Sequence, residues 1–229
     1  MYKGLNPMRT LYHLVLCPFS RRVRVALQEK KVEFRLVEEN PKERRVEFLT
    51  LNPAGEVPVL VEPDGFAVSG SDPICEYLDE MFPDPPLIGD SPIERAETRR
   101  LVAWFERKFH GEVTVKLVDE KLLKRLNRSG EPDSGVIRAG HANLRQHLDY
   151  IDYLIERRRW LAGERITYAD MAAAAQLSCV DYLGDVRWDA HEPARDWYAR
   201  IKSRPSFRAL LADHVAGAPP PKHYADLDF

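Results

Sequence analysis

A proline-rich polar segment at residues 83–92 divides the chain into two parts with different sequence periodicity. Residues 9–82 alternate between strand-like runs and amphipathic helical runs, whereas residues 93–215 contain helical patterns only. A chain with this division is expected to form an α/β N-terminal domain, a linker and an all-α C-terminal domain. The remaining residues are an N-terminal extension, 1–8, and a C-terminal tail, 216–229.

The first part has the order β-α-β, an irregular connection, and then β-β-α, which predicts a small mixed sheet. Turn residues at Pro63-Asp64-Gly65 separate the last two strands. The final helix is expected to begin with Ser71 as its N-cap. The predicted strands are 9–16, 32–39, 56–63 and 65–70, and the predicted helices are 20–31 and 71–82.

The second part contains helical repeats of apolar residues separated by polar breaks. If the run 167–183 is helical, alanine and leucine lie on almost every face of the helix, which predicts a helix buried on every side. The other predicted helical runs are 93–126, 136–158 and 192–215, the last interrupted at Pro205.

Composition limits the classes of function. The net charge is −2, from 34 basic and 36 acidic residues, which argues against a general nucleic-acid binder. No apolar run approaches the roughly 20 residues of a membrane span, and the N-terminus has no apolar signal core, so we expect a cytoplasmic protein. Three widely spaced cysteines do not indicate a disulfide framework, and the seven histidines show no metal-ligand spacing, so no metal site is expected.

Cys17 is the first candidate for chemistry. Pro18 suits the first position of a helix, which makes Cys17 the expected N-cap, where backbone N–H groups and the helix dipole favour a thiolate. Arg21, Arg22 and Arg24 add nearby positive charge. Without a second cysteine nearby, a mixed disulfide with an external thiol is the available redox chemistry. The alternative is a cysteine that only packs there, as expected for Cys75 and Cys179.

Two further segments suggest binding. Pro58 precedes a strand, and a cis bond after Val57 would present the backbone of Val57 to an extended peptide; an ordinary loop proline is the alternative. The tail is stiff at Pro219–Pro221 and then carries alternating apolar and acidic residues. We expect it to dock on a partner or to pack on its own domain, and the two are compatible. The candidate anchors are Tyr224, Asp226, Leu227, Asp228 and Phe229.

Four stretches together resemble the signature regions of the cytosolic glutathione S-transferase superfamily. They are LYHLVLCPFSRRVRVAL, LNPAGEVPVLV, VSGSDPICEYLDE and LAGERITYADMAAAA, in the expected order. The resemblance covers about residues 9–215 and implies the GST fold: a thioredoxin-like N-terminal domain, an all-helical C-terminal domain and a homodimer.

The resemblance also implies roles for individual residues. Cys17 lies where omega- and beta-like members keep a catalytic cysteine, and Ser20 is a second candidate for assisting a thiolate. Val57 would pair with the cysteinyl part of glutathione, and Pro58 would be the cis-proline. Ser71 would bind the γ-glutamyl carboxylate at a helix N-terminus. Thr167 and Asp170 match a structural capping box, with Ile166 and Met171 as its hydrophobic staple.

One position departs from the family pattern. An acidic residue usually precedes the serine and holds the glutamyl end, but here Gly70 occupies that position. Losing a charge-assisted hydrogen bond costs about 1.5–3 kcal/mol. Asp72 could compensate, although its helical offset points it elsewhere. The family also places the first long helix at a substrate cleft, so Trp104, Phe105 and Phe109 would line a hydrophobic pocket or, alternatively, form core.

A closer resemblance involves a group of GST-like cell-division proteins of alphaproteobacteria that associate with FtsZ. It includes the tail PPPKHYADLDF, which ordinary transferases do not share. Two hypotheses follow. The first is a glutathione-dependent transferase in which Cys17 acts on a small electrophile or a mixed disulfide. The second is a non-catalytic regulator that binds FtsZ through its dimer and its tail.

Overall fold

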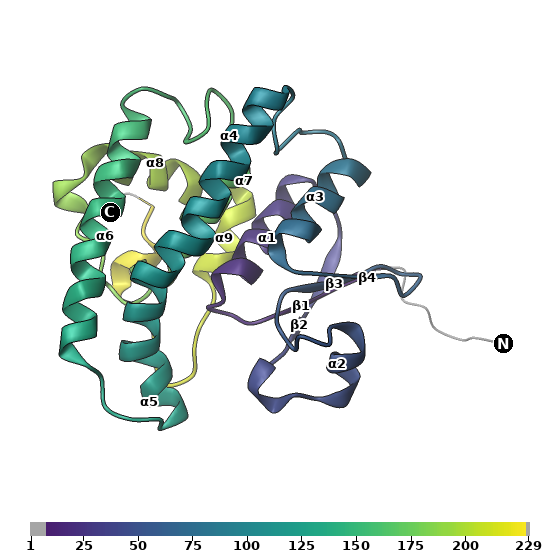
Figure 1. Cartoon of the computed structure of the whole chain (residues 1–229), viewed down its shortest axis with the longest axis horizontal. Helices are drawn as coiled ribbons and strands as arrows, with labels where there is room; N and C mark the ends of the chain where they lie inside the picture. The colour runs from purple at the N-terminus through teal and green to yellow at the C-terminus, as the bar shows by residue number, and fades with distance from the viewer. Residues whose placement is uncertain (1–7, 228–229) are drawn as a thin grey trace. The chain divides into compact units, whose positions relative to one another are not determined.

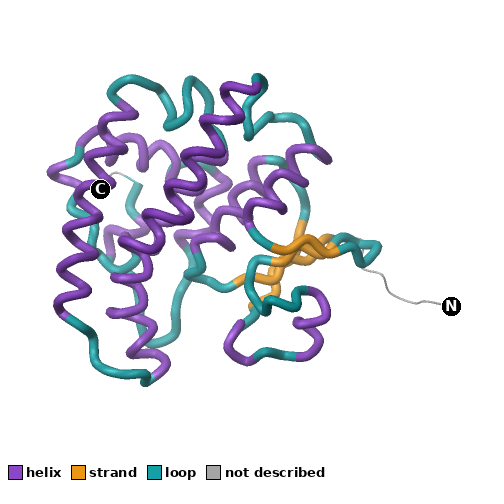
Figure 2. Tube along the Cα trace, in the orientation of Figure 1, coloured by secondary structure: helices purple, strands orange, loops and turns teal. Residues whose placement is uncertain are grey.

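The computed structural model describes residues 8–227. The chain divides into two compact units, the first ending at Pro86 and the second beginning at Leu87. All strands of the described sheet belong to the first unit, and the second unit is built from helices (Figures 1 and 2). The expected α/β part followed by an all-α part is therefore confirmed.

The first unit contains a four-stranded mixed sheet with strand order β2-β1-β3-β4. β1 pairs with β2 in parallel, in register Leu11 to Leu36, and with β3 antiparallel, in register Leu11 to Leu60. β3 and β4 form an antiparallel hairpin. Leu11 and Leu60 are fully buried at its centre. The strands are β1 (Arg9–His13), β2 (Phe34–Glu38), β3 (Val59–Val61) and β4 (Ala67–Ser69).

Helices α1 (Pro18–Glu29) and α3 (Ser71–Met81) pack against each other on one side of this sheet (Figure 1). Val23 and Leu27 lie on the apolar face of α1 and are completely buried. Just beyond the helix, Lys30 Nζ donates to Asp79 Oδ1 on α3 at 2.7 Å. It also donates to two backbone carbonyl oxygens near the end of the unit, so its buried charge is fully engaged.

Two details of the first unit differ from the sequence-based expectation. The connection after β2 contains a short helix, α2 (Val46–Leu51), on the other side of the sheet from α1 and α3 (Figure 1). With six residues, α2 is shorter than the window over which helical periodicity can be recognised in a sequence, and only its Phe48 is buried. The N-cap of α3 is Gly70, and Ser71 is its first helical residue. The predicted N-cap role of Ser71 is thus wrong.

The second unit begins with one long helical run. Its first segment, α4 (Pro92–Ala103), starts with a capping box between Ser91 and Glu94. The middle segment is wider, since the N–H of Lys124 bonds to the carbonyl of Asp119, five residues earlier. The run comprises α4, η2 (Trp104–Leu123) and α5 (Lys124–Asn127).

Helix α7 (Tyr168–Asp181) packs against α4 and η2, and every one of its residues is buried. This confirms the expectation from its alanine-rich sequence. Thr167 Oγ1 accepts from the N–H of Ala169, and the Asp170 carboxylate accepts from the N–H of Thr167, so the predicted capping box is present. Within residues 8–227, every helix is too short or too polar to cross a bilayer. The other helices are α6 (Ser134–Ile155), α8 (Glu192–Lys202) and α9 (Pro205–Leu211).

Candidate functional site

Cys17 is the N-cap of α1, as predicted. Its φ and ψ of −76° and 115° are extended, while its carbonyl already accepts from the N–H of Arg21 at 3.0 Å. The N–H of Cys17 in turn donates to the carbonyl of Leu14 at 3.1 Å. These bonds hold the half-buried thiol beside the positive end of the helix dipole, where a developing thiolate is stabilised.

The loop that precedes β3 places Val57 next to Cys17. Cys17 Sγ lies 4.0 Å from the carbonyl oxygen of Val57. Asn52 holds this loop, because its side chain donates to the carbonyl of Glu56 at 2.8 Å and accepts from the N–H of Ala54 at 3.2 Å. The Val57-Pro58 peptide is cis, as the family resemblance implied.

The Val57 backbone can pair with a ligand. Within residues 8–227, the N–H of Val57 has no hydrogen-bond acceptor. Over the same described residues, the hydrogen-bond partner of its carbonyl is the thiol of Cys17, at the weak distance of 4.0 Å. An extended peptide with a thiol-bearing residue would therefore find an N–H and a C=O beside a cysteine.

The start of α3 lies beside the same loop. The N–H of Gly70 donates to the carbonyl of Pro58 at 3.0 Å, which links the loop directly to the residue before Ser71. Ser71 is buried in the first turn of α3, an 11-residue helix whose first N–H groups favour an anion. The tertiary structure thus brings Cys17, Val57 and Ser71 together at one edge of the first unit.

Asp72 is paired with a side chain that sequence reasoning treated only as nearby charge. Arg22 Nη1 lies 2.6 Å from Asp72 Oδ1. The Arg22 side chain is 3% exposed, and that of Asp72 is 55% exposed, so the carboxylate compensates a buried guanidinium. Asp72 consequently joins α3 to α1, and it is not left over to replace the missing acidic group at Gly70.

Ser20 is fully buried on the inner side of α1. Its hydroxyl accepts from the N–H of Leu14 at 3.4 Å. In this position Ser20 shapes the turn that leads into Cys17 and is not accessible to a substrate. Its predicted role in assisting a thiolate finds no geometric support.

The three aromatic residues proposed for a hydrophobic pocket belong to the second unit. Phe105 and Phe109 are 0% exposed and pack ring to ring, with centroids 6.1 Å apart, so they are core residues. Trp104 is half-buried, and its Nε1–H donates to His147 Nδ1 at 3.1 Å. His147 Nε2 must then carry the proton, which it donates to Glu112 Oε2 at 3.0 Å. Burial lowers the pKa of His147, and Glu112 opposes that shift.

The tail packs on its own unit. Tyr224 is fully buried, with its ring 5.2 Å from that of Tyr182 in an edge-to-face arrangement, and its hydroxyl donates to the carbonyl of Leu210. The hydroxyl of Tyr182 donates to the carbonyl of Ala218 and accepts from the N–H of Val215, both at 2.8 Å. Tyr224 is thus an internal anchor. Asp226 is exposed and Leu227 half-buried; Asp228 and Phe229 lie outside the described residues.

Three side chains of the described residues have the composition of a metal site. Ligand atoms of Asp149, Asp152 and His191 lie within 4.8 Å of one another. Asp152 is already engaged, because it accepts from His191 Nδ1 at 2.7 Å and from the N–H of Ala194 at 2.8 Å. These bonds cap the start of α8, which accounts for the cluster without an ion.

Comparison with known proteins identifies the family. Residues 11–86 match the glutathione S-transferase N-terminal domain, and residues 134–200 match the glutathione S-transferase C-terminal domain. The chain belongs to the glutathione S-transferase family. Members of this family generally use glutathione as a cosubstrate, and the expected GST fold is confirmed.

Within this family, the chain is similar to proteins whose names indicate different roles. FtsZ-localized protein A of Caulobacter vibrioides is 48% identical over 96% of this chain and 98% of its own. The maleylacetoacetate isomerase of Pseudomonas aeruginosa is 30% identical over 91% and 97% of the two chains. Among solved structures, a glutathione S-transferase from Rhodospirillum rubrum F11 has 57% identity and a TM-score of 0.95, over 97% of this chain and all of the other. FzlA from C. crescentus has 48% identity and a TM-score of 0.94, with the same coverage.

Proposed function

We propose that this glutathione S-transferase-family chain acts as an FtsZ-binding protein of cell division. The observation that carries the proposal is the similarity to FtsZ-localized protein A, which extends over nearly the full length of both chains. The proposal retains the cytoplasmic location predicted from the sequence.

The first unit supports this reading. Gly70 supplies no carboxylate beside Ser71, and Asp72 is paired with Arg22. A glutathione molecule bound there would lack the acidic partner that family members place at its glutamyl end. Weak glutathione binding is consistent with a scaffold whose main ligand is a protein.

Co-sedimentation with polymerised FtsZ tests the proposal. We expect the full chain to pellet with FtsZ in the presence of GTP and to stay in the supernatant without FtsZ. A chain truncated after Ala225 keeps the Tyr224 anchor and removes only the end of the tail. If the tail contacts FtsZ, this truncation reduces pelleting while the unfolding midpoint stays unchanged.

Removal of residues 218–229 would also delete Tyr224 and uncover Tyr182, so it serves as the disruptive comparison. Full pelleting by both truncations would exclude the tail as the binding element. Absence of pelleting by the full chain would refute the proposal itself.

A second candidate function rests on the contact between Cys17 and Val57. In glutathione-dependent thiol transfer, the Cys17 thiolate attacks the glutathionyl sulfur of a mixed disulfide and releases the substrate as its thiolate. A second glutathione thiolate then attacks the Cys17 sulfur of the new mixed disulfide. Oxidised glutathione leaves and the Cys17 thiolate is restored. Val57 would pair with the peptide backbone of glutathione. Conjugation to a small electrophile is the alternative reaction at the same position.

Calorimetry and kinetics separate this candidate from the first. We expect glutathione to bind only weakly because of Gly70, and Cys17→Ala to abolish turnover of a glutathionylated peptide. Turnover that is unchanged in Cys17→Ala would remove Cys17 from the mechanism. FtsZ pelleting by Cys17→Ala should equal that of the unmodified chain. Loss of thiol transfer in this variant therefore leaves the FtsZ-binding proposal to be tested on its own.

A further inference from the structure

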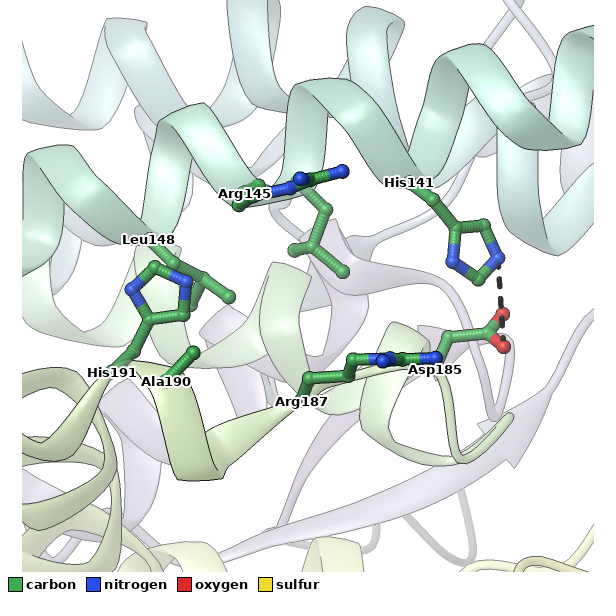
Figure 3. A pocket seen from close by; sticks show the side chains of 8 residues that line it. His141, Arg145, Leu148, Asp185, Arg187, Ala190 and His191 are labelled. Carbon is green, nitrogen blue, oxygen red and sulfur yellow. Dashed lines mark ion pairs between the residues drawn. The ribbon is translucent and has the colours of Figure 1, made fainter.

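A pocket in the second unit is separate from the residues discussed above as a glutathione site. It has a volume of about 440 Å³ and lies between α6 and the segment that precedes α8 (Figure 3). Leu144 and Leu148 are almost fully buried and supply apolar surface. The other lining residues are His141, Arg145, Asp185, Arg187, Ala190 and His191.

Two arginines line this pocket without an ion-pair partner among the described residues. Arg145 and Arg187 are exposed, stand on opposite sides of the pocket (Figure 3), and form no ion pair with any side chain of residues 8–227. The one carboxylate in the lining, Asp185, is engaged by Lys121 and lies 3.7 Å from His141. His191 of the lining is paired with Asp152 at 2.7 Å and lies 3.6 Å from Asp149. The pocket therefore combines an apolar floor with two guanidinium groups that have no ion-pair partner, while its carboxylate and this imidazole are already paired.

The geometry of α6 sets the length of an occupant. His141, Leu144, Arg145 and Leu148 recur at helical spacing, so they share one face of α6. The seven residue steps from His141 to Leu148 correspond to about 10 Å along the helix axis. An extended peptide covers that length with about three residues.

The charges restrict the chemistry of the occupant. Arginine matches carboxylates in a bidentate geometry, while the two leucines accept an aliphatic side chain. We propose that this pocket docks an acidic peptide segment of a partner protein, with an aliphatic residue flanked by two carboxylates. This docking site involves none of Cys17, Val57 and Ser71, and it does not depend on the FtsZ-binding proposal.

Fluorescence anisotropy with the full chain tests the proposal. The probe is a fluorescein-labelled, amidated peptide, Gly-Asp-Leu-Asp-Gly. We expect saturable binding that weakens as salt is raised, because screening acts on the exposed guanidinium groups. Arg145→Gln and Arg187→Gln should each lower the affinity about fivefold.

Matched controls make the result specific. Arg208→Gln removes an exposed arginine of α9 from outside the pocket and should leave the affinity unchanged. Replacing the leucine of the probe by serine, or both aspartates by asparagine, should abolish saturation. An equal loss in Arg208→Gln would show non-specific attraction and overturn the proposal. If succinate competed as well as the unlabelled probe, the pocket would be a site for small anions and the peptide proposal would be refuted. Absence of binding at millimolar probe would also refute the proposal.

Discussion

At the scale of single residues, Gly70 affects both the backbone conformation at the start of α3 and the expected affinity for glutathione. Its φ of +90° lies in the region that favours glycine, and it is the N-cap of α3. A Cβ at this position would meet Pro73 Cδ at 3.4 Å, an ordinary contact. The cost of a side chain at Gly70 is therefore a backbone cost rather than a clash.

We predict that Gly70→Ala lowers the free energy of unfolding by about 1–3 kcal/mol, the cost of a positive-φ conformation that L-residues rarely adopt. Gly70→Glu should have a similar cost and should raise glutathione affinity about tenfold by restoring a carboxylate beside Ser71. Urea denaturation and calorimetry measure the two effects.

Gly111→Ala is the matched control, because Gly111 is helical and nothing lies within 4 Å of its Cβ position. This substitution should stabilise the chain slightly. A Gly70→Ala variant as stable as the unmodified chain would contradict the backbone argument.

At the scale of elements, the hydroxyl of Tyr182 connects α7 to the tail. It both donates to Ala218 and accepts from Val215, and the ring supports Tyr224. Tyr182→Phe should lower stability by about 1–3 kcal/mol, because it leaves the buried carbonyl of Ala218 and the half-buried N–H of Val215 without this partner. Amide exchange at Val215 should accelerate more than exchange within α7. The exposed Tyr153→Phe variant should show neither change.

A carboxylate on α4 connects this helix to the segment after α6. Glu97 accepts from Arg100 and Arg158, and these guanidinium groups lower its pKa to about 2. Because the pKa is lower in the folded state, the stabilisation is complete above about pH 4.5 and disappears as the pH falls to about 2.

We predict that Glu97→Gln lowers the free energy of unfolding by about 1 kcal/mol at pH 7, since both partners remain accessible to solvent. The difference from the unmodified chain should narrow below pH 4.5 and vanish near pH 2. Urea denaturation across this pH range provides the measurement. Glu164→Gln removes an exposed carboxylate of the same unit and should have no effect at any pH. A deficit that persists near pH 2 would exclude the ionic contribution.

At the scale of the whole molecule, the family resemblance implies a homodimer. We predict that light scattering gives twice the monomer mass at micromolar concentration. A dimer presents two copies of each binding surface, so it could contact two FtsZ subunits of a filament and gain avidity. A monomeric mass throughout the concentration range of FtsZ pelleting would exclude this source of avidity.

The predictability of the site differed between its residues for physical reasons. Local signals were sufficient for Cys17, because Pro18 defines the first helical position, and for Thr167 with Asp170, because a capping box lies within four residues. The sequence predicts Ser71 as the N-cap of α3, but the structure places Gly70 there, with a positive φ and with its N–H bonded to the carbonyl of Pro58, a contact that no local pattern encodes. Sequence spacing could not reveal the Arg22–Asp72 pair either.

The sequence by itself determined the class of fold, the buried character of α7 and the start of α1. These follow from periodicity and capping, which act over a few residues. Only the tertiary structure decided that Val57 lies beside the Cys17 thiol, that Ser20 and Phe109 are buried, and that Tyr224 anchors the tail internally. It also decided that Arg145 and Arg187 face one pocket. The reason is that contacts between residues far apart in sequence depend on how elements pack, and no local pattern encodes that packing.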